Sequence, residues 1–263
     1  MRTSWIISFA ALCETAVFIY TLATGTIRRA PWMQTPTVAP SGNMQLNDAS
    51  ETIEELEALI AREPQGRRVA GGFSHFRLAQ RYTEAGRLED ARAAWEEAAR
   101  RRLAAAQSNP DRESFWFEAG WALWKLGRMD EATPALMEAE RLASLPHPNQ
   151  RREDQWYRLG WSRKLLGFDQ DAAFAFSRAM DFLPASIPDW DAETHYKHAR
   201  YLALLGDSEG ALVALERAAA AGYDKPGVAA SSDDLASIRS HPRFQGALER
   251  IRNAPRRYDL GPG

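Results

Sequence analysis

The chain has 263 residues, of which 45% are hydrophobic and 26% charged, with a formal net charge of −2. This is the composition of an ordinary globular protein, long enough for one large domain or an extended repeat array, and it excludes a general electrostatic attraction to nucleic acid. The single cysteine, Cys13, excludes an intramolecular disulfide and leaves the compartment open.

Residues 5–27 form the first predicted element, an apolar segment with one charged residue, Glu14. A helix of this length covers roughly 34 Å, enough to cross a bilayer core of about 30 Å. We interpret residues 1–29 as an uncleaved single-pass membrane anchor. A cleaved signal peptide is the alternative, with a weak exit sequence at residues 22–25.

Glu14 lies near the middle of the predicted span, where a carboxylate is costly. Two interpretations stay open. The glutamate is tolerated in a protonated form, or it makes an intramembrane contact with another protein, since Ala10, Ala11 and Gly25 share its helix face. Arg2 favours a cytoplasmic N-terminus, whereas Arg28 and Arg29 favour the reverse orientation. Because a very short N-terminal tail usually stays inside, we expect the following domain to be periplasmic rather than cytoplasmic, in a bacterial cell.

A linker and a helical domain follow the predicted anchor. Residues 30–49 hold three prolines and little periodicity, which is typical of an extended tether. Residues 50–252 are predicted to be all helical, and they begin with an amphipathic capping helix at 50–63 that covers the exposed end of a stack.

Self-similarity at a period near 40 residues is the strongest signal in the chain. Four glycines follow one another at intervals of 41, 40 and 39 residues, and each predicts the end of the first helix of a pair. Small residues seven positions earlier allow two helices to cross closely, and large apolar residues nine positions later fill the remaining space. The glycines are Gly86, Gly127, Gly167 and Gly206, the small residues Ala79, Gly120, Gly160 and Ala199, and the large ones Trp95, Leu136, Phe176 and Leu215.

The pattern resembles the tetratricopeptide repeat (TPR), although its period is near 40 rather than about 34 residues. The third copy is nearest to the family signature, with Trp156, Leu159, Gly160, Ala172, Phe176, Ala179 and Pro184. The resemblance implies an all-α fold, a right-handed α-solenoid of about four TPR-like helix pairs with helical caps at both ends. The apolar segment 5–27 predicts a single N-terminal hydrophobic helix before it. The pairs are expected at about 72–107, 113–144, 153–184 and 192–222, and the C-terminal cap at 231–252.

Residues 253–263 are expected to form a disordered tail. No motif of the chain carries catalysis or binds a cofactor. The best metal candidate, Glu193 with His195 and His198, is interpreted as packed neutral histidines because both histidines stand in core positions of the repeat. The acidic pair Asp233-Asp234 is interpreted as a solvated helix cap.

The resemblance also implies where a partner binds, because in such stacks the first helix of each pair lines the concave side. The positions outside the packed core share one face. We expect an aromatic groove that takes an apolar or aromatic-containing segment with acidic flanks, rather than a bare C-terminal carboxylate. The alternative is that these rings only pack on each other and on neighbouring helices. The predicted groove residues are Phe76, Gln80, Phe117, Trp121, Trp124, Tyr157, Arg158, Trp161, Lys164, Tyr196, Lys197 and Arg200.

Three functions follow in order of preference. The first is a non-catalytic protein-interaction scaffold, a membrane-anchored accessory or assembly subunit of a membrane protein complex. The second is an exported soluble peptide-binding adaptor with a cleaved leader. The third is an enzyme with an unrecognised site, for which no residue pattern speaks. Protein partners are expected in the first two, with no nucleic acid and no small-molecule substrate.

Overall fold

The structure is a computed structural model that describes residues 52–62, 71–145, 152–184 and 190–253. These residues belong to one compact unit, Gln45–Gly263, and their regular elements are all helices, which confirms the all-α prediction for the described residues. In these ranges no helix combines the length and the apolar character that crossing a bilayer requires. The predicted span 5–27 with Glu14, the linker 30–49 and residues 254–263 lie outside the described residues.

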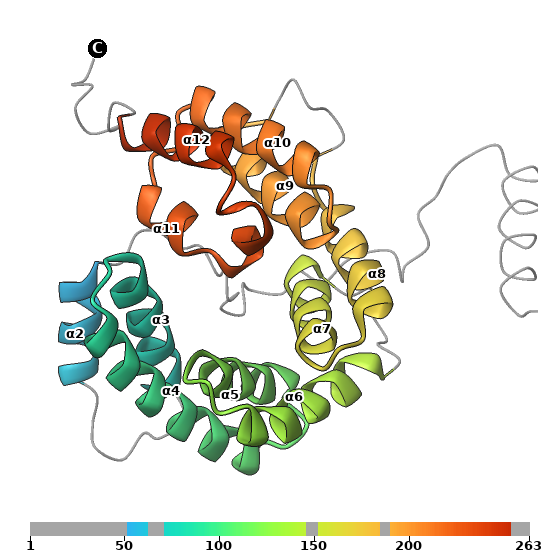
Figure 1. Ribbon diagram of the computed structural model, residues 1–263. Helices are drawn as coiled ribbons and strands as arrows, with labels where there is room; N and C mark the ends of the chain where they lie inside the picture. The colour runs from blue at the N-terminus through green and yellow to red at the C-terminus, as the bar shows by residue number, and fades with distance from the viewer. Residues whose placement is uncertain (1–51, 63–70, 146–151, 185–189, 254–263) are drawn as a thin grey trace, which may run out of the picture. The chain divides into compact units, whose positions relative to one another are not determined.

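Eight helices form four consecutive hairpins, so the described residues build a TPR-like helical solenoid. Figure 1 shows the hairpins following one another around a curve, with α7 and α9 on its inner side and α8 and α10 outside. A further helix, α2 (Ile53–Ala61), starts at a capping box of Thr52 and Glu55 and packs on α3. The hairpins are α3 (Gly71–Glu84) with α4 (Leu88–Ser108), α5 (Glu113–Lys125) with α6 (Met129–Ser144), α7 (Glu153–Leu165) with α8 (Asp169–Met180), and α9 (Ala192–Leu204) with α10 (Ser208–Ala220).

Glycines end the first helix of each hairpin, as the spacing predicts. Gly86, Gly127, Gly167 and Gly206 have φ between 73° and 86°, the left-handed region that other residues rarely adopt. The residue after each glycine donates its backbone N–H to a carbonyl five residues earlier, at 2.8 to 2.9 Å. This is the Schellman pattern of helix ends, and it satisfies carbonyls that the helix would otherwise leave unpaired.

Within a hairpin, the small residue that precedes the helix-ending glycine packs against the large apolar residue that follows it. A Cβ atom added to Gly160 would lie 2.5 Å from a ring carbon of Phe176, and one added to Gly120 would lie 2.7 Å from the Cγ of Leu136. Such distances are far below ordinary contact, so only glycine lets the two helices approach this closely at these positions.

Gly160→Ala is expected to destabilise the protein. Overpacking costs about 1–3 kcal/mol, and the higher helix propensity of alanine returns at most about 1 kcal/mol. Gly246 is the matched control, because it also lies within a helix but a Cβ there meets open space. Urea unfolding should show a loss of stability for Gly160→Ala and none for Gly246→Ala. Equal stabilities of the two variants would contradict the close approach of α7 and α8.

Buried ion pairs link successive hairpins. Arg102 of α4 lies 2.5 Å from Glu118 of α5, and both side chains are only 4% exposed. Burial raises the pKa of Glu118 to about 7 and lowers the pKa of Arg102, so the cost of desolvation exceeds the attraction within the pair. In the next joint, Arg158 of α7 reaches Glu113 of α5 at 3.1 Å.

The C-terminal segment returns toward the beginning of the solenoid, and Figure 1 shows α11 (Pro226–Ser231) on the side that faces α3. Its next elements are a 3-10 helix, η3 (Asp233–Ile238), which packs on α9, and α12 (Pro242–Arg252), which packs on α10. Helix α11 also contacts α3, and a Cβ on Gly227 would lie 2.8 Å from the backbone oxygen of Glu84. The C-terminal segment therefore touches the first hairpin as well as the last.

Candidate functional site

Two consecutive carboxylates of η3, Asp233 and Asp234, lie on the inner side of the solenoid. Side chains from three successive hairpins donate hydrogen bonds to them. The donors belong to the first helix of their hairpin, namely α5, α7 and α9, which places them on the side that the repeat pattern predicts to be concave. We call this arrangement, Lys125, Tyr157, Trp161 and Arg200 around Asp233 and Asp234, the acid-binding site.

Asp234 is the centre of the acid-binding site and is only 4% exposed. The hydroxyl of Tyr157 donates to its two oxygens at 3.0 and 3.2 Å, and the indole N–H of Trp161 donates at 2.9 Å. The guanidinium of Arg200 donates to the same carboxylate and supplies its counter-charge. A buried carboxylate needs such a set of partners, because water no longer solvates it.

The electrostatics of the site depend on this pair. Burial alone would lower the pKa of Arg200, but the charge of Asp234 raises it well above the usual value, so the guanidinium stays charged. The Arg200 guanidinium also lies 5.2 Å from the ring centroid of Tyr157. Burial, with the nearby charge of Asp234 adding to it, raises the pKa of Tyr157, which keeps this hydroxyl a hydrogen-bond donor.

Asp233 is held at the more open end of the site. The ammonium of Lys125 lies 2.9 and 3.0 Å from its two oxygens. Burial raises the pKa of Asp233, while the charge of Lys125 acts in the opposite direction. The ion pair of Lys125 with Asp233 is partly exposed, so water and salt screen it more than the pair of Arg200 with Asp234. It therefore contributes less to stability.

Two apolar residues of η3 that follow the acidic pair, Leu235 and Ile238, are buried. Leu235 and Ile238 pack in a cluster with Ala203 of α9, Leu212 of α10 and Phe244 of α12. The segment that occupies the inner face thus has an acidic start and an apolar continuation.

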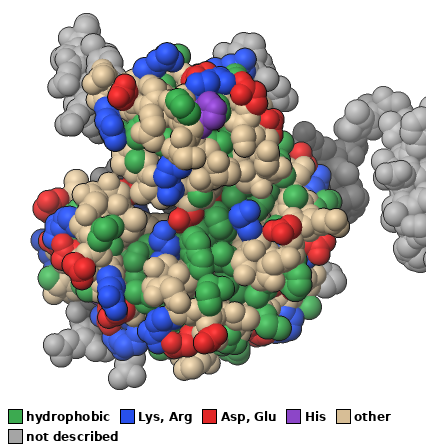
Figure 2. Space-filling view, in the orientation of Figure 1, with side chains coloured by type: hydrophobic (Ala, Val, Ile, Leu, Met, Phe, Trp, Pro, Cys, Tyr) green, Lys and Arg blue, Asp and Glu red, His purple; other side chains and the backbone are tan. Residues whose placement is uncertain are grey.

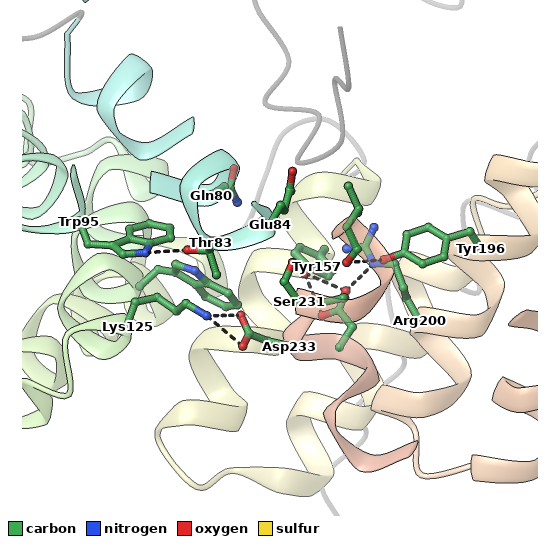
Figure 3. Close-up of a pocket in the computed structure, with 14 residues that line it drawn as sticks. Gln80, Thr83, Glu84, Trp95, Lys125, Tyr157, Tyr196, Arg200, Ser231 and Asp233 are labelled. Carbon is green, nitrogen blue, oxygen red and sulfur yellow. Dashed lines mark hydrogen bonds and ion pairs between the residues drawn. The ribbon is translucent and has the colours of Figure 1, made fainter. Parts of the chain in front are cut away.

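A cavity of about 80 Å³ remains beside this segment, lined by residues of α3, α4, α5, α7 and α9 on one side and by Val228 and residues 231–234 on the other. Figure 2 shows a hollow at the centre of this face, with hydrophobic side chains on its floor and charged ones around it. In Figure 3, Gln80, Thr83 and Trp95 lie toward one side of the cavity and Tyr196 and Arg200 toward the other. The inner face is therefore partly filled and partly open.

The predicted aromatic face is packed rather than exposed, which corrects the expectation of an open aromatic groove. Trp121 and Trp161 are 7% and 3% exposed, and their rings meet edge to face with centroids 4.8 Å apart. Phe76 and Phe117 are buried in the same core, and Tyr196 stacks on Tyr223 at 4.3 Å. The curvature of the stack brings neighbouring rings into contact, which a pattern along one helix does not reveal.

The predicted groove residues divide into four groups in the structure, and the first consists of the buried rings of Phe76, Phe117 and Trp161. Gln80, Trp121, Tyr157, Tyr196 and Arg200 line the same cavity. Arg158 and Lys197 form ion pairs between neighbouring hairpins. Arg158 pairs with Glu113, and the Lys197 ammonium lies 3.4 Å from a carboxylate oxygen of Glu153. Trp124 is partly exposed and Lys164 exposed, and they lie near the ends of α5 and α7.

The histidines of the fourth hairpin pack against an aromatic ring. His195 and His198 lie 5.5 and 4.9 Å from Trp190, measured between ring centroids. Burial lowers the pKa of both imidazoles, and each is thereby favoured in its neutral form. In the part of the chain that the structure describes, no three His, Cys, Asp or Glu side chains are grouped as metal ligands.

The interpretation of Asp233-Asp234 as a solvated cap is wrong for Asp234, since the carboxylate is buried and bonded to α7 and α9. The signal that could have indicated this is charge complementarity. Lys125 and Arg200 belong to the face that the repeat predicts to be concave, and an acidic pair next to buried apolar residues is a matching occupant.

Comparisons with known proteins find TPR structures only at low similarity. No protein-family model and no curated protein matches the chain. A crystal structure of MamA is 15% identical and covers 66% of this chain and 91% of its own, with a TM-score of 0.33. The TPR-like repeats of a kinesin-light-chain-like protein from Podosopora anserina are 20% identical over 69% and 93%, with a TM-score of 0.35. YrrB, described as a TPR protein with an unusual peptide-binding site, is 16% identical over 77% and 93%, with a TM-score of 0.31.

Proposed function

We propose that the protein is a non-catalytic scaffold that binds other polypeptides on the inner face of its helical solenoid. The observation that carries this proposal is that the face already holds a polypeptide segment, residues 232–238, through donors from three hairpins. A surface that binds one segment by side-chain donors and an apolar pocket has the chemistry to bind another. The open cavity beside the segment gives a partner access to the same face.

In its finer form, the proposal is a membrane-anchored accessory or assembly subunit of a membrane protein complex. It is supported by the apolar segment 5–27, which is long enough to span a bilayer, and by Glu14 within it as an intramembrane contact with a partner. The helical domain is then periplasmic. The second candidate, an exported soluble adaptor, rests on the weak exit sequence at residues 22–25.

The experiment is extraction of the full-length protein with a mild detergent, followed by identification of the proteins that co-purify. Gln80→Trp places a bulky ring in the open cavity, and Gln170→Trp makes the same change at an exposed position of α8. We expect Gln80→Trp to reduce the yield of the specific partner at least about fivefold, since truncating or blocking central contacts costs about 1 kcal/mol or more. Gln170→Trp should leave the yield unchanged.

Both variants must keep the helical circular-dichroism signal and the melting temperature of the wild type. If Gln80→Trp and the wild type gave equal yields of the co-purified partner, the partner would bind elsewhere than on the inner face. Absence of any specific partner would reject the scaffold itself. Recovery of residues 1–27 on the membrane-extracted protein supports the anchored form, whereas a mature protein that lacks them supports the exported adaptor.

A further inference from the structure

We propose that the acid-binding site recognises partner segments that carry two consecutive acidic residues followed by a leucine, and that residues 232–238 occupy it in the free protein as an internal ligand. This inference rests on the proposed function. It adds the chemistry of the partner and a means of regulation, since the internal segment and the partner compete for one site.

The charges of the site define the first requirement for an occupant. The side chains of Arg200 and Lys125 are only 11% and 17% exposed, and each is paired with a carboxylate of η3. If η3 left the site without replacement, Arg200 and Lys125 would lose their counter-charges and Tyr157 and Trp161 their acceptor, so an occupant with carboxylates is favoured. A replacing segment must therefore bring two carboxylates at the same spacing.

The neutral donors and the apolar contacts define the second requirement. Tyr157 and Trp161 donate to the carboxylate of Asp234 from within the packed ring cluster, so their positions are fixed by their neighbours. Leu235, directly after the acidic pair, is completely buried. The fitting sequence is therefore acidic, acidic, leucine, in the order in which the chain itself presents it.

The internal segment is covalently tethered, which makes it a strong competitor. A tethered ligand has an effective concentration in the millimolar range, so a free peptide of equal intrinsic affinity binds weakly until the internal copy is loosened. Partner binding in the wild type is then restrained by residues 232–238. The contact of α11 with α3 at Glu84 helps to hold that segment in place.

The test uses a fluorescent peptide with the sequence of residues 231–239, SSDDLASIR, and the full-length protein. In the variant Asp233→Asn/Asp234→Asn the internal ligand loses its charges while keeping its shape. We expect the peptide to bind this variant about tenfold more tightly than the wild type, because the competing internal copy is weakened. Fluorescence anisotropy measures the affinity, and the peptide should also raise the melting temperature of the variant.

Two controls make the result specific to charge and position. Asp169→Asn/Asp171→Asn removes the same charges from exposed positions of α8 and should bind the peptide as weakly as the wild type. A peptide with asparagine at both acidic positions, SSNNLASIR, should bind no variant. The single variant Asp233→Asn removes only the partly exposed ion pair with Lys125. We expect it to remain folded and to bind the acidic peptide more tightly than the wild type, with a smaller gain in affinity than the double variant shows. It replaces the double variant in the test if that variant does not fold.

The proposal is overturned if the acidic peptide binds no folded variant, or if the asparagine peptide binds as well as the acidic one. Neither outcome rejects the proposed scaffold function, provided that the wild type still co-purifies with a specific partner and Gln80→Trp reduces the yield of that partner. Failure of capture by every form, with normal peptide binding, would instead reject the proposed function and keep the recognition chemistry.

Discussion

Replacing Trp161 by alanine is expected to lower the free energy of unfolding by about 3–5 kcal/mol, the range for truncating a buried tryptophan. The ring is 3% exposed and contacts Trp121 and Phe176, so its removal leaves a cavity between α5, α7 and α8. The substitution also deprives the buried carboxylate of Asp234 of a donor. The loss should appear in urea unfolding followed by circular dichroism.

Trp161→Phe separates the two contributions. Phenylalanine keeps most of the ring packing but cannot donate to Asp234, and the unmade hydrogen bond to a charged group costs about 1.5–3 kcal/mol. We therefore expect this variant to lie between the wild type and Trp161→Ala. Wild-type stability of Trp161→Ala would show that the tryptophan faces solvent and that the ring cluster does not hold the hairpins together.

Replacing Arg102 by methionine is expected to destabilise the protein by about 3–5 kcal/mol at pH 8, because it leaves the buried charge of Glu118 without its partner. The effect should be smaller at pH 5. Burial raises the pKa of Glu118 from the usual 4.5 to about 7, so the folded state holds the proton more tightly than the unfolded state. The stabilisation that comes from protonated Glu118 in the folded state is therefore complete below pH 4.5 and is lost as the pH rises through about 7.

Arg102→Met/Glu118→Leu is the control for this joint, since replacing both partners of a buried pair by apolar residues is often neutral or stabilising. Unfolding curves at pH 5 and pH 8 should show a pH-dependent loss for the single variant and little loss for the double variant. A single variant as stable as the wild type at pH 8 would indicate that Glu118 is solvated.

The repeat pattern by itself predicted the helices and their close contacts. Gly86 and its three equivalents mark helix ends because the left-handed conformation is a local property of one residue. The close helix crossing at Gly160 also followed from the sequence, because small residues recur at a fixed offset before the glycine of each copy, whereas the contact of Gly160 with Phe176 is seen in the structure. Periodicity carries this information within a hairpin, where contacts are near in the chain.

Only the tertiary structure decided what occupies the inner face. The contacts that define the acid-binding site join residues far apart in the chain, 108 positions for Lys125 with Asp233 and 73 for Trp161 with Asp234. An acidic pair at a helix start has the same local pattern whether it is solvated or buried. The burial of Asp234 and of the groove tryptophans arises from the curvature of the stack and the return of residues 226–238, and both are properties of the assembled helices rather than of any one segment.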